Sequence, residues 1–127
     1  MKKLSILVAI LVIVITACAP KATEEVATES PAKPFRVGFV TDTAGIADKS
    51  FNQTQWEGIL RAQTELGIQA QYAQSTEASQ YTPNLTTFAS EGYDLVIASG
   101  FFLANDLSLV AEQYPDTHFI ICDMTFP

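Results

Sequence analysis

The chain has 127 residues, a length typical of one domain. Apolar residues make up 48% of the chain and charged residues 17%, so it can form a core and is not disordered along most of its length. Acidic residues outnumber basic residues by 14 to 7, and no lysine or arginine follows Arg61. This balance excludes nucleic acid as a partner, because affinity for phosphates depends on basic side chains.

Residues 1–17 have the pattern of a secretory signal peptide. Two lysines precede an apolar run from Leu4 to Ile15, which only one serine interrupts. Spanning a bilayer takes about 20 apolar residues, so this run is too short for a membrane helix and suits the centre of a signal. An uncleaved anchor and an ordinary signal followed by a chance cysteine are the alternatives.

The four residues Ile15-Thr16-Ala17-Cys18 resemble the lipobox of bacterial lipoproteins: an aliphatic residue, two small residues and a cysteine. The resemblance implies that Cys18 becomes the N-terminus and is acylated on its sulfur. Two or three acyl chains hold a protein stably on a bilayer. Residues 18–34 contain the cysteine and a stretch of alanine, threonine, glutamate, lysine and proline that reads as a flexible tether. We therefore expect a lipid-anchored protein at the cell membrane, facing the outside or the periplasm.

Residues 35–127 alternate between strand and helix patterns. Strands are expected at 35–41, 68–72, 94–99 and 118–122, and helices at 51–66, 83–91 and 102–113. Ser50 and Thr82 are the predicted N-caps, and Gly67 is the predicted left-handed stop of the first helix. This order predicts an α/β fold with an open parallel sheet flanked by helices. Ligands of such sheets bind at the carboxyl ends of the strands.

The first predicted helix carries a candidate stacking residue. Its expected buried stripe is formed by Trp56, Ile59, Leu60 and Gln63. Phe51 lies about 140° from Trp56 on a helical wheel, so it is predicted to lie off this stripe. A large aromatic at a helix start, next to strand ends, suits stacking on a planar ligand. The alternatives are a hydrophobic staple or a contact with a further part of the protein.

Two polar residues near Phe51 are further candidates. Asn52 offers both a donor and an acceptor, which suits the edge of a base. Asp42 ends the first predicted strand, where its carboxylate could accept from a ligand hydroxyl or amine, or else bind the amides of its own loop.

Catalytic and metal motifs are absent from the sequence. There is no Gly-x-Ser-x-Gly elbow, no Gly-x-Gly-x-x-Gly, no phosphate loop and no cysteine–histidine cluster with metal spacing. No cofactor is predicted, and an α/β enzyme is the least favoured reading. A lipid-anchored structural protein is a third class. Cys122 lies in an apolar strand pattern and is expected to be a buried free thiol.

Three separated strings carry a resemblance to a known family. They are Asp48-Lys49-Ser50-Phe51-Asn52-Gln53, the segment from Tyr93 to Phe102, and Tyr114-Pro115-Asp116-Thr117-His118-Phe119 leading to Asp123. In this order, together with the lipobox, they resemble the basic membrane protein family of purine nucleoside receptor lipoproteins. These are the substrate-binding components of nucleoside ABC importers.

The resemblance implies a type I periplasmic-binding fold, in which two α/β lobes close on a nucleoside. Residues 35–127 would be the N-terminal part of the first lobe, so this chain alone should bind nucleoside weakly or not at all. The partners would be a purine nucleoside, the membrane through the lipid anchor, and an ABC permease. A sugar or another small solute, or a sensory role, would suit the same fold.

The resemblance also assigns roles to residues at matching positions. Phe51 would stack on the base and Asn52 would bind its edge. Asp42 and Asp123 would meet polar groups of the ligand, while Gly100 and Phe101 would line the wall of the cleft.

Overall fold

The computed structural model describes residues 33–126. The predicted signal segment 1–17, the predicted lipidation site Cys18 and most of the predicted tether 18–34 lie outside the described residues. Within the described part, no helix has the length and apolar character needed to cross a membrane.

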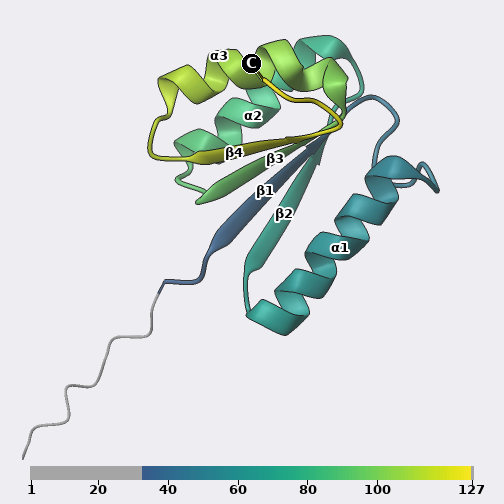
Figure 1. The fold of residues 1–127 in the computed structure, drawn as a ribbon, viewed down its shortest axis with the longest axis vertical. Helices are drawn as coiled ribbons and strands as arrows, with labels where there is room; N and C mark the ends of the chain where they lie inside the picture. Colours follow the sequence, from purple (N-terminus) through teal and green to yellow (C-terminus); the bar gives the residue numbers. More distant parts are fainter. Residues whose placement is uncertain (1–32, 127) are drawn as a thin grey trace, which may run out of the picture. The chain divides into compact units, whose positions relative to one another are not determined.

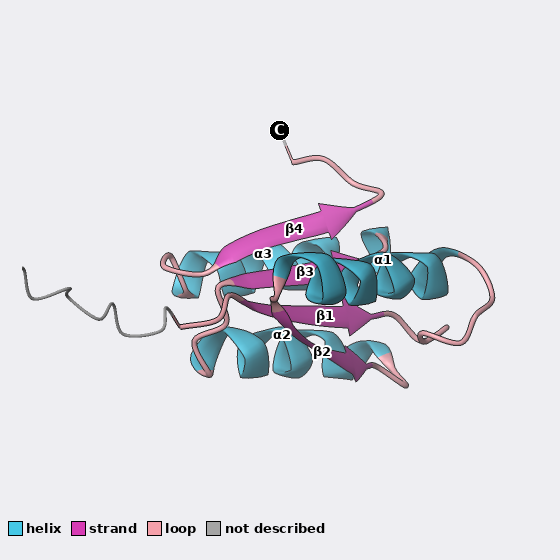
Figure 2. Cartoon of the chain, turned by 90° about the horizontal axis from the view of Figure 1, so that it is seen from below, coloured by secondary structure: helices cyan, strands magenta, loops and turns pink. Residues whose placement is uncertain are grey.

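Strands and helices alternate as the sequence predicts. The elements are β1 (Arg36–Thr41), α1 (Phe51–Leu66), β2 (Gln69–Gln74), α2 (Tyr81–Ser90), β3 (Leu95–Ser99), α3 (Ala104–Gln113) and β4 (His118–Cys122). Two 3₁₀ turns, η1 (Ala78–Gln80) and η2 (Phe101–Leu103), precede α2 and α3. All strand pairs are parallel and the strand order is β2-β1-β3-β4 (Figure 2). The predicted open parallel α/β sheet is confirmed.

The helices cover the two faces of the sheet unequally. Figure 1 shows α1 on one face and α2 with α3 on the other. Right-handed crossovers require this arrangement, because the chain moves to one side from β1 to β2 and back across β1 from β2 to β3. The larger core lies under α2 and α3 and includes Val40, Leu85, Val96, Leu103 and Val110, all fully buried. A smaller core under α1 contains Val37, Phe39 and Ile59.

The start of α1 differs from the prediction. The Ser50 side chain makes no cap hydrogen bond. The Asp48 carboxylate instead accepts from the backbone N–H groups of Ser50, Asn52 and Gln53 at 2.9–3.0 Å. A carboxylate reaches more of the free amides of the first turn than a hydroxyl does, and its charge suits the helix N-terminus. The predicted stop at Gly67 is confirmed, with φ of 69°.

Three further details correct the sequence prediction. Leu60 and Gln63 are exposed, so the buried stripe of α1 is narrower than predicted and follows Asn52, Trp56 and Ile59. The predicted N-cap Thr82 lies inside α2, which begins at Tyr81 after η1. Its hydroxyl donates to the Asp106 carboxylate and so links α2 to α3. The helix predicted at 102–113 begins as the 3₁₀ turn η2 and becomes α-helical at Ala104.

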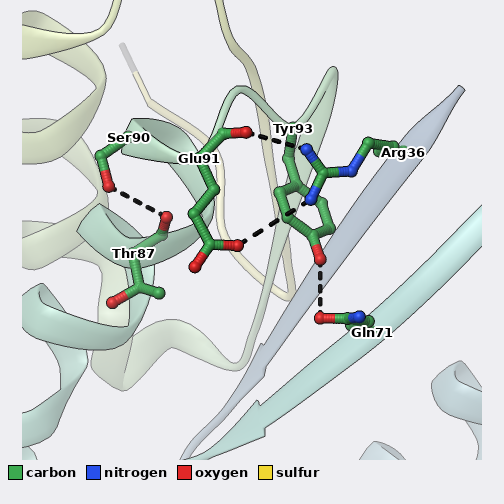
Figure 3. Close-up of polar contacts among 6 residues, drawn as sticks. All are labelled: Arg36, Gln71, Thr87, Ser90, Glu91 and Tyr93. Carbon is green, nitrogen blue, oxygen red and sulfur yellow. Dashed lines mark hydrogen bonds and ion pairs between the residues drawn. The ribbon is translucent and has the colours of Figure 1, made fainter. Parts of the chain in front are cut away.

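Side chains at the amino edge of the sheet bind one another (Figure 3). The Arg36 guanidinium lies 3.8 Å from the centre of the Tyr93 ring and donates to the Glu91 carbonyl oxygen at 2.8 Å. The Tyr93 hydroxyl donates to the Gln71 side-chain oxygen at 2.7 Å. The Arg36, Glu91, Tyr93 and Gln71 side chains at this edge therefore already have partners within the chain.

Candidate ligand-binding site

Three strands end side by side at the carboxyl edge of the sheet. In the strand register Thr41 of β1 pairs with Ser99 of β3, which pairs in turn with Cys122 of β4. The next residue of each strand is a predicted site residue: Asp42, Gly100 and Asp123. The parallel register therefore gathers three of the candidates at one edge, although up to 81 positions separate them in the sequence.

Asp42 uses one carboxylate oxygen within the protein. Its Oδ1 accepts from the backbone N–H of Ala44 at 3.1 Å and from Asn52 Nδ2 at 2.8 Å. Its Oδ2 accepts no hydrogen bond from any residue between 33 and 126. The alternative that Asp42 bonds the amides of its own loop is thus confirmed for Oδ1, and the contact of Asp42 with a ligand stays a prediction.

Asn52 does not match its predicted role of reading a base edge. Its side chain is 1% exposed and is fully engaged inside the lobe. The amide nitrogen donates to Asp42 Oδ1 and to the Gly45 carbonyl oxygen, the latter at 3.1 Å, while the amide oxygen accepts from the Ser99 hydroxyl. A side chain buried and bonded in this way has no free donor for a ligand, so the interpretation of Asn52 as a base contact is corrected.

Gly100 lies directly against Asp42. A Cβ added at Gly100 would lie 3.7 Å from Asp42 Oδ2, and the glycine has φ of 99°, which L side chains rarely adopt. A side chain here would therefore strain the backbone, while its Cβ would make an ordinary contact with Oδ2. On the next strand, Asp123 is exposed and has φ of 77°. A non-glycine residue in this conformation is uncommon and often belongs to a functional loop.

Exposed aromatic rings border the carboxyl edge. Phe51, the first residue of α1, is 43% exposed, in agreement with its predicted place off the buried stripe. Phe101 is 52% exposed and its ring centre lies 4.3 Å from that of Phe102, which is 62% exposed. Large exposed aromatic side chains at the same edge as carboxylate groups suit a ligand with both a flat apolar part and hydrogen-bond donors.

Sequence reasoning missed Tyr81 at this edge. Burial raises the pKa of Tyr81 above its ordinary value, the Asp42 carboxylate raises it further, and Asp106 adds to the effect against opposing hydrogen bonds with Thr43. The Tyr81 phenol therefore stays protonated close to two carboxylates. No sequence pattern marked it, because Tyr81 comes between a polar loop and a helix and reads as an ordinary core aromatic.

One cavity of the described residues is apolar, and its lining includes Cys122, the last residue of β4. A groove of about 460 Å³ opens beside α1, on the sheet face that α1 covers in part. Its lining is almost entirely apolar, with Phe35, Ile59, Leu66, Leu95, Ile97 and Cys122 among the contributors. Cys122 is half-buried in this groove rather than fully buried as predicted. Burial and then the neighbouring Asp123 raise the pKa of the Cys122 thiol.

The described residues offer no metal site: residues 33–126 contain no group of three or more histidine, cysteine, aspartate or glutamate side chains placed to hold an ion. The carboxyl edge instead offers carboxylates, a glycine and aromatic rings. This is the edge at which an α/β lobe of a solute-binding protein presents its ligand. The fold and the edge together define the class: part of an α/β lobe whose candidate ligand site lies at the carboxyl ends of a parallel sheet.

Comparison with known proteins identifies the family. The family model described as "ABC transporter substrate-binding protein PnrA-like" matches residues 35–126, and the chain belongs to this family of basic membrane proteins. An uncharacterised lipoprotein of Pyrococcus abyssi is 35% identical over 123 residues, which cover 96% of this chain and 30% of that protein. The ABC transporter nucleoside-binding protein BmpA of Lactococcus lactis is 36% identical over 93 residues, which cover 70% of this chain and 25% of that protein.

Solved structures agree with this assignment. An ABC transporter solute-binding protein from Aeropyrum pernix K1 superimposes with a TM-score of 0.68 at 29% identity, covering 72% of this chain and 25% of that one. A solute-binding protein from Conexibacter woesei superimposes with a TM-score of 0.61 at 28% identity, covering 66% and 28%. The chain spans between about a quarter and a third of the length of the curated relatives it matches.

Proposed function

We propose that this chain contributes the N-terminal part of the first lobe of a lipid-anchored receptor that captures purine nucleosides for an ABC importer. The observation that carries the proposal is the carboxyl edge, where Asp42 and Asp123 follow the parallel strands on either side of β3 and Phe51, the first residue of α1, is exposed next to Asn52, which bonds to Asp42. A purine offers a flat face for the ring, and a ribose offers hydroxyls that donate to carboxylates. The relative from Lactococcus lactis, named as a nucleoside-binding protein, supports the same choice.

A sugar is the second candidate, and the same carboxylates support it. Ribose and hexoses also donate hydroxyl hydrogen bonds to aspartates, so Asp42 and Asp123 serve either ligand. Exposed aromatic rings favour the nucleoside, because only the base brings a delocalised face that covers a phenyl ring. A sensory receptor with the same ligand is a further alternative, in which the solute is detected and not handed to a permease.

The sequence and the relatives support a location on the outer side of the cell membrane. Cys18 in the lipobox would carry the acyl chains, and the tether would hold the lobe outside the membrane. Several relatives are named lipoproteins, among them the one from Pyrococcus abyssi. A permease partner follows from the family, whose members deliver solutes to ABC transporters.

The experiment needs a complete two-lobed protein. A hybrid receptor, in which residues 35–126 replace the matching segment of the Lactococcus lactis protein, is titrated calorimetrically with inosine, guanosine and ribose. We expect both nucleosides to bind more tightly than ribose. Ribose binding more tightly than either nucleoside would move the assignment to sugars. Loss of all binding in a folded hybrid, with the parent protein still binding nucleoside, would count against the proposed function.

A further inference from the structure

Four side chains form one continuous series of hydrogen bonds, which we name the Asp42 relay. Gln55 Nε2 donates to Ser99 Oγ at 2.8 Å, and the Ser99 hydroxyl donates to Asn52 Oδ1. Asn52 Nδ2 then donates to Asp42 Oδ1 at 2.8 Å. The relay joins α1 to the ends of β1 and β3 and terminates at the carboxylate of the candidate site.

The direction of the relay is determined at its Asp42 end. An ionised carboxylate only accepts hydrogen bonds, and the Gly45 carbonyl oxygen beside it also only accepts. Asn52 must therefore turn its amide nitrogen to both and its oxygen to Ser99. The single hydroxyl proton of Ser99 is then used, so Ser99 Oγ can only accept, and Gln55 must present its amide nitrogen.

This direction explains an unpaired atom. Gln55 Oε1 is buried and finds no hydrogen-bond partner within residues 33–126. A buried acceptor without a partner is unfavourable and requires a physical reason. Reversing the Gln55 amide would place its oxygen against Ser99 Oγ. These two oxygens would repel each other, because the single Ser99 proton is already donated to Asn52. The same Gln55 nitrogen also donates to the Phe51 carbonyl oxygen at 3.2 Å, so two acceptors favour this orientation of the amide and leave Oε1 unpaired.

We propose that Asn52 is a positioning residue for Asp42 and not a ligand contact, and this rests on the proposed function. Asn52 and the Ala44 amide hold Oδ1, which leaves Oδ2 as the oxygen offered to the ligand. A Cβ added at Gly100 would lie 3.7 Å from Oδ2 and meet no other atom within 4 Å, so no side chain or backbone crowds this oxygen from the Gly100 side. Ser99 supports this arrangement, because its hydrogen bond to Asn52 Oδ1 keeps the Asn52 amide nitrogen directed at Asp42.

A double-mutant cycle in the hybrid receptor tests this role. We expect Asn52→Ala to weaken inosine binding about tenfold, the cost of a lost charge-assisted hydrogen bond. In an Asp42→Ala background the same change should alter the dissociation constant by less than about twofold, because nothing remains to be positioned. A direct base contact, or a general loss of lobe structure, would weaken binding equally in both backgrounds and would overturn the proposal. Gln53→Ala, beside Asn52 with a side chain bonded only to Glu57, is the matched control.

Two further measurements test the Asp42 relay even if Asn52→Ala misfolds or the hybrid receptor does not bind inosine. Ser99→Ala removes the support without touching Asp42, and we expect it to weaken inosine binding several-fold at an unchanged fold by circular dichroism. In the detergent-solubilised full chain, NMR should show slow hydrogen exchange of the Asn52 side-chain amide, accelerated by Asp42→Ala. Exchange as fast as that of the exposed Asn105 amide would refute the relay, whether or not the hybrid binds nucleosides.

Discussion

The ring of Phe88 on α2 lies directly against the backbone of Gly38 in β1. A Cβ added at Gly38 would lie 2.4 Å from the nearest ring atom, closer than real Cβ contacts. Phe88 also meets Tyr93 edge to face, with ring centres 4.7 Å apart, so the ring has little room to retreat. The absence of a side chain at Gly38 is therefore what allows α2 to pack on the sheet.

This contact predicts the effect of one methyl group. Gly38→Ala should destabilise the lobe by about 1–3 kcal/mol, the usual range for overpacking a close-packed core. Gly58→Ala is the matched control, because a Cβ at Gly58 in α1 meets nothing within 4 Å. That control should stabilise the lobe by about 0.5–1 kcal/mol, since alanine is the better helix former. Thermal or urea unfolding of the hybrid receptor measures both, and equal stabilities of the two variants would contradict the packing argument.

The Asp48 cap predicts a pH dependence. Burial raises the pKa of Asp48, but hydrogen bonds from the amides of Asn52, Gln53 and Ser50 bring it below the ordinary value of 3.8. A carboxyl group with a lower pKa in the folded state stabilises the fold above its unfolded pKa and loses this effect as the pH falls through the folded pKa. Asp48→Ala should therefore lower the melting temperature at pH 7, and the difference should shrink below pH 3.8. Asp116→Ala, at an exposed aspartate, should show neither effect.

The exposed Phe51 predicts a loss of binding without a loss of folding. If Phe51 stacks on the base, Phe51→Ala in the hybrid receptor should cost roughly 1–3 kcal/mol of binding free energy, about 5- to 150-fold in the dissociation constant for inosine. The melting temperature should change little, because Phe51 is 43% exposed. Tight inosine binding by Phe51→Ala would remove the stacking role.

Trp56 provides the comparison for Phe51 on the same helix. Its indole stacks on Phe39 of β1 with ring centres 5.9 Å apart and meets Tyr72 of β2 edge to face at 5.1 Å. Trp56→Ala should therefore cost about 3 kcal/mol of stability, the lower end for a large aromatic because Trp56 is only half-buried. Phe51→Ala should therefore lower the affinity for inosine with little change in melting temperature, whereas Trp56→Ala should lower the melting temperature.

The lipobox predicts the site of attachment. Cys18→Ser should abolish incorporation of a fatty-acid probe in cells, because serine has no sulfur atom to which the acyl group can be attached. Cys122→Ser should label like the wild type. Equal labelling of wild type and Cys18→Ser would contradict the lipoprotein assignment.

Local patterns in the sequence were enough to predict the order of strands and helices. The apolar β-rich runs, the stop at Gly67 and the helical periodicity around Leu103, Leu107 and Val110 depend on neighbours a few residues away. The exposed position of Phe51 followed from the same helical geometry. The gathering of Asp42, Gly100 and Asp123 also followed, because parallel strands end at a common edge.

Only the tertiary structure decided which atoms at that edge are free. Asn52 reads in the sequence as an available amide, yet a hydrogen bond from Ser99, 47 positions away, and the Asp42 carboxylate engage it completely. Ser50 and Thr82 read as caps, but Asp48 takes the first role and Asp106 binds the second hydroxyl. Local sequence determines where the backbone bends and which face is apolar. Hydrogen bonds between distant segments depend on strand register and helix packing, which exist only once the chain has folded.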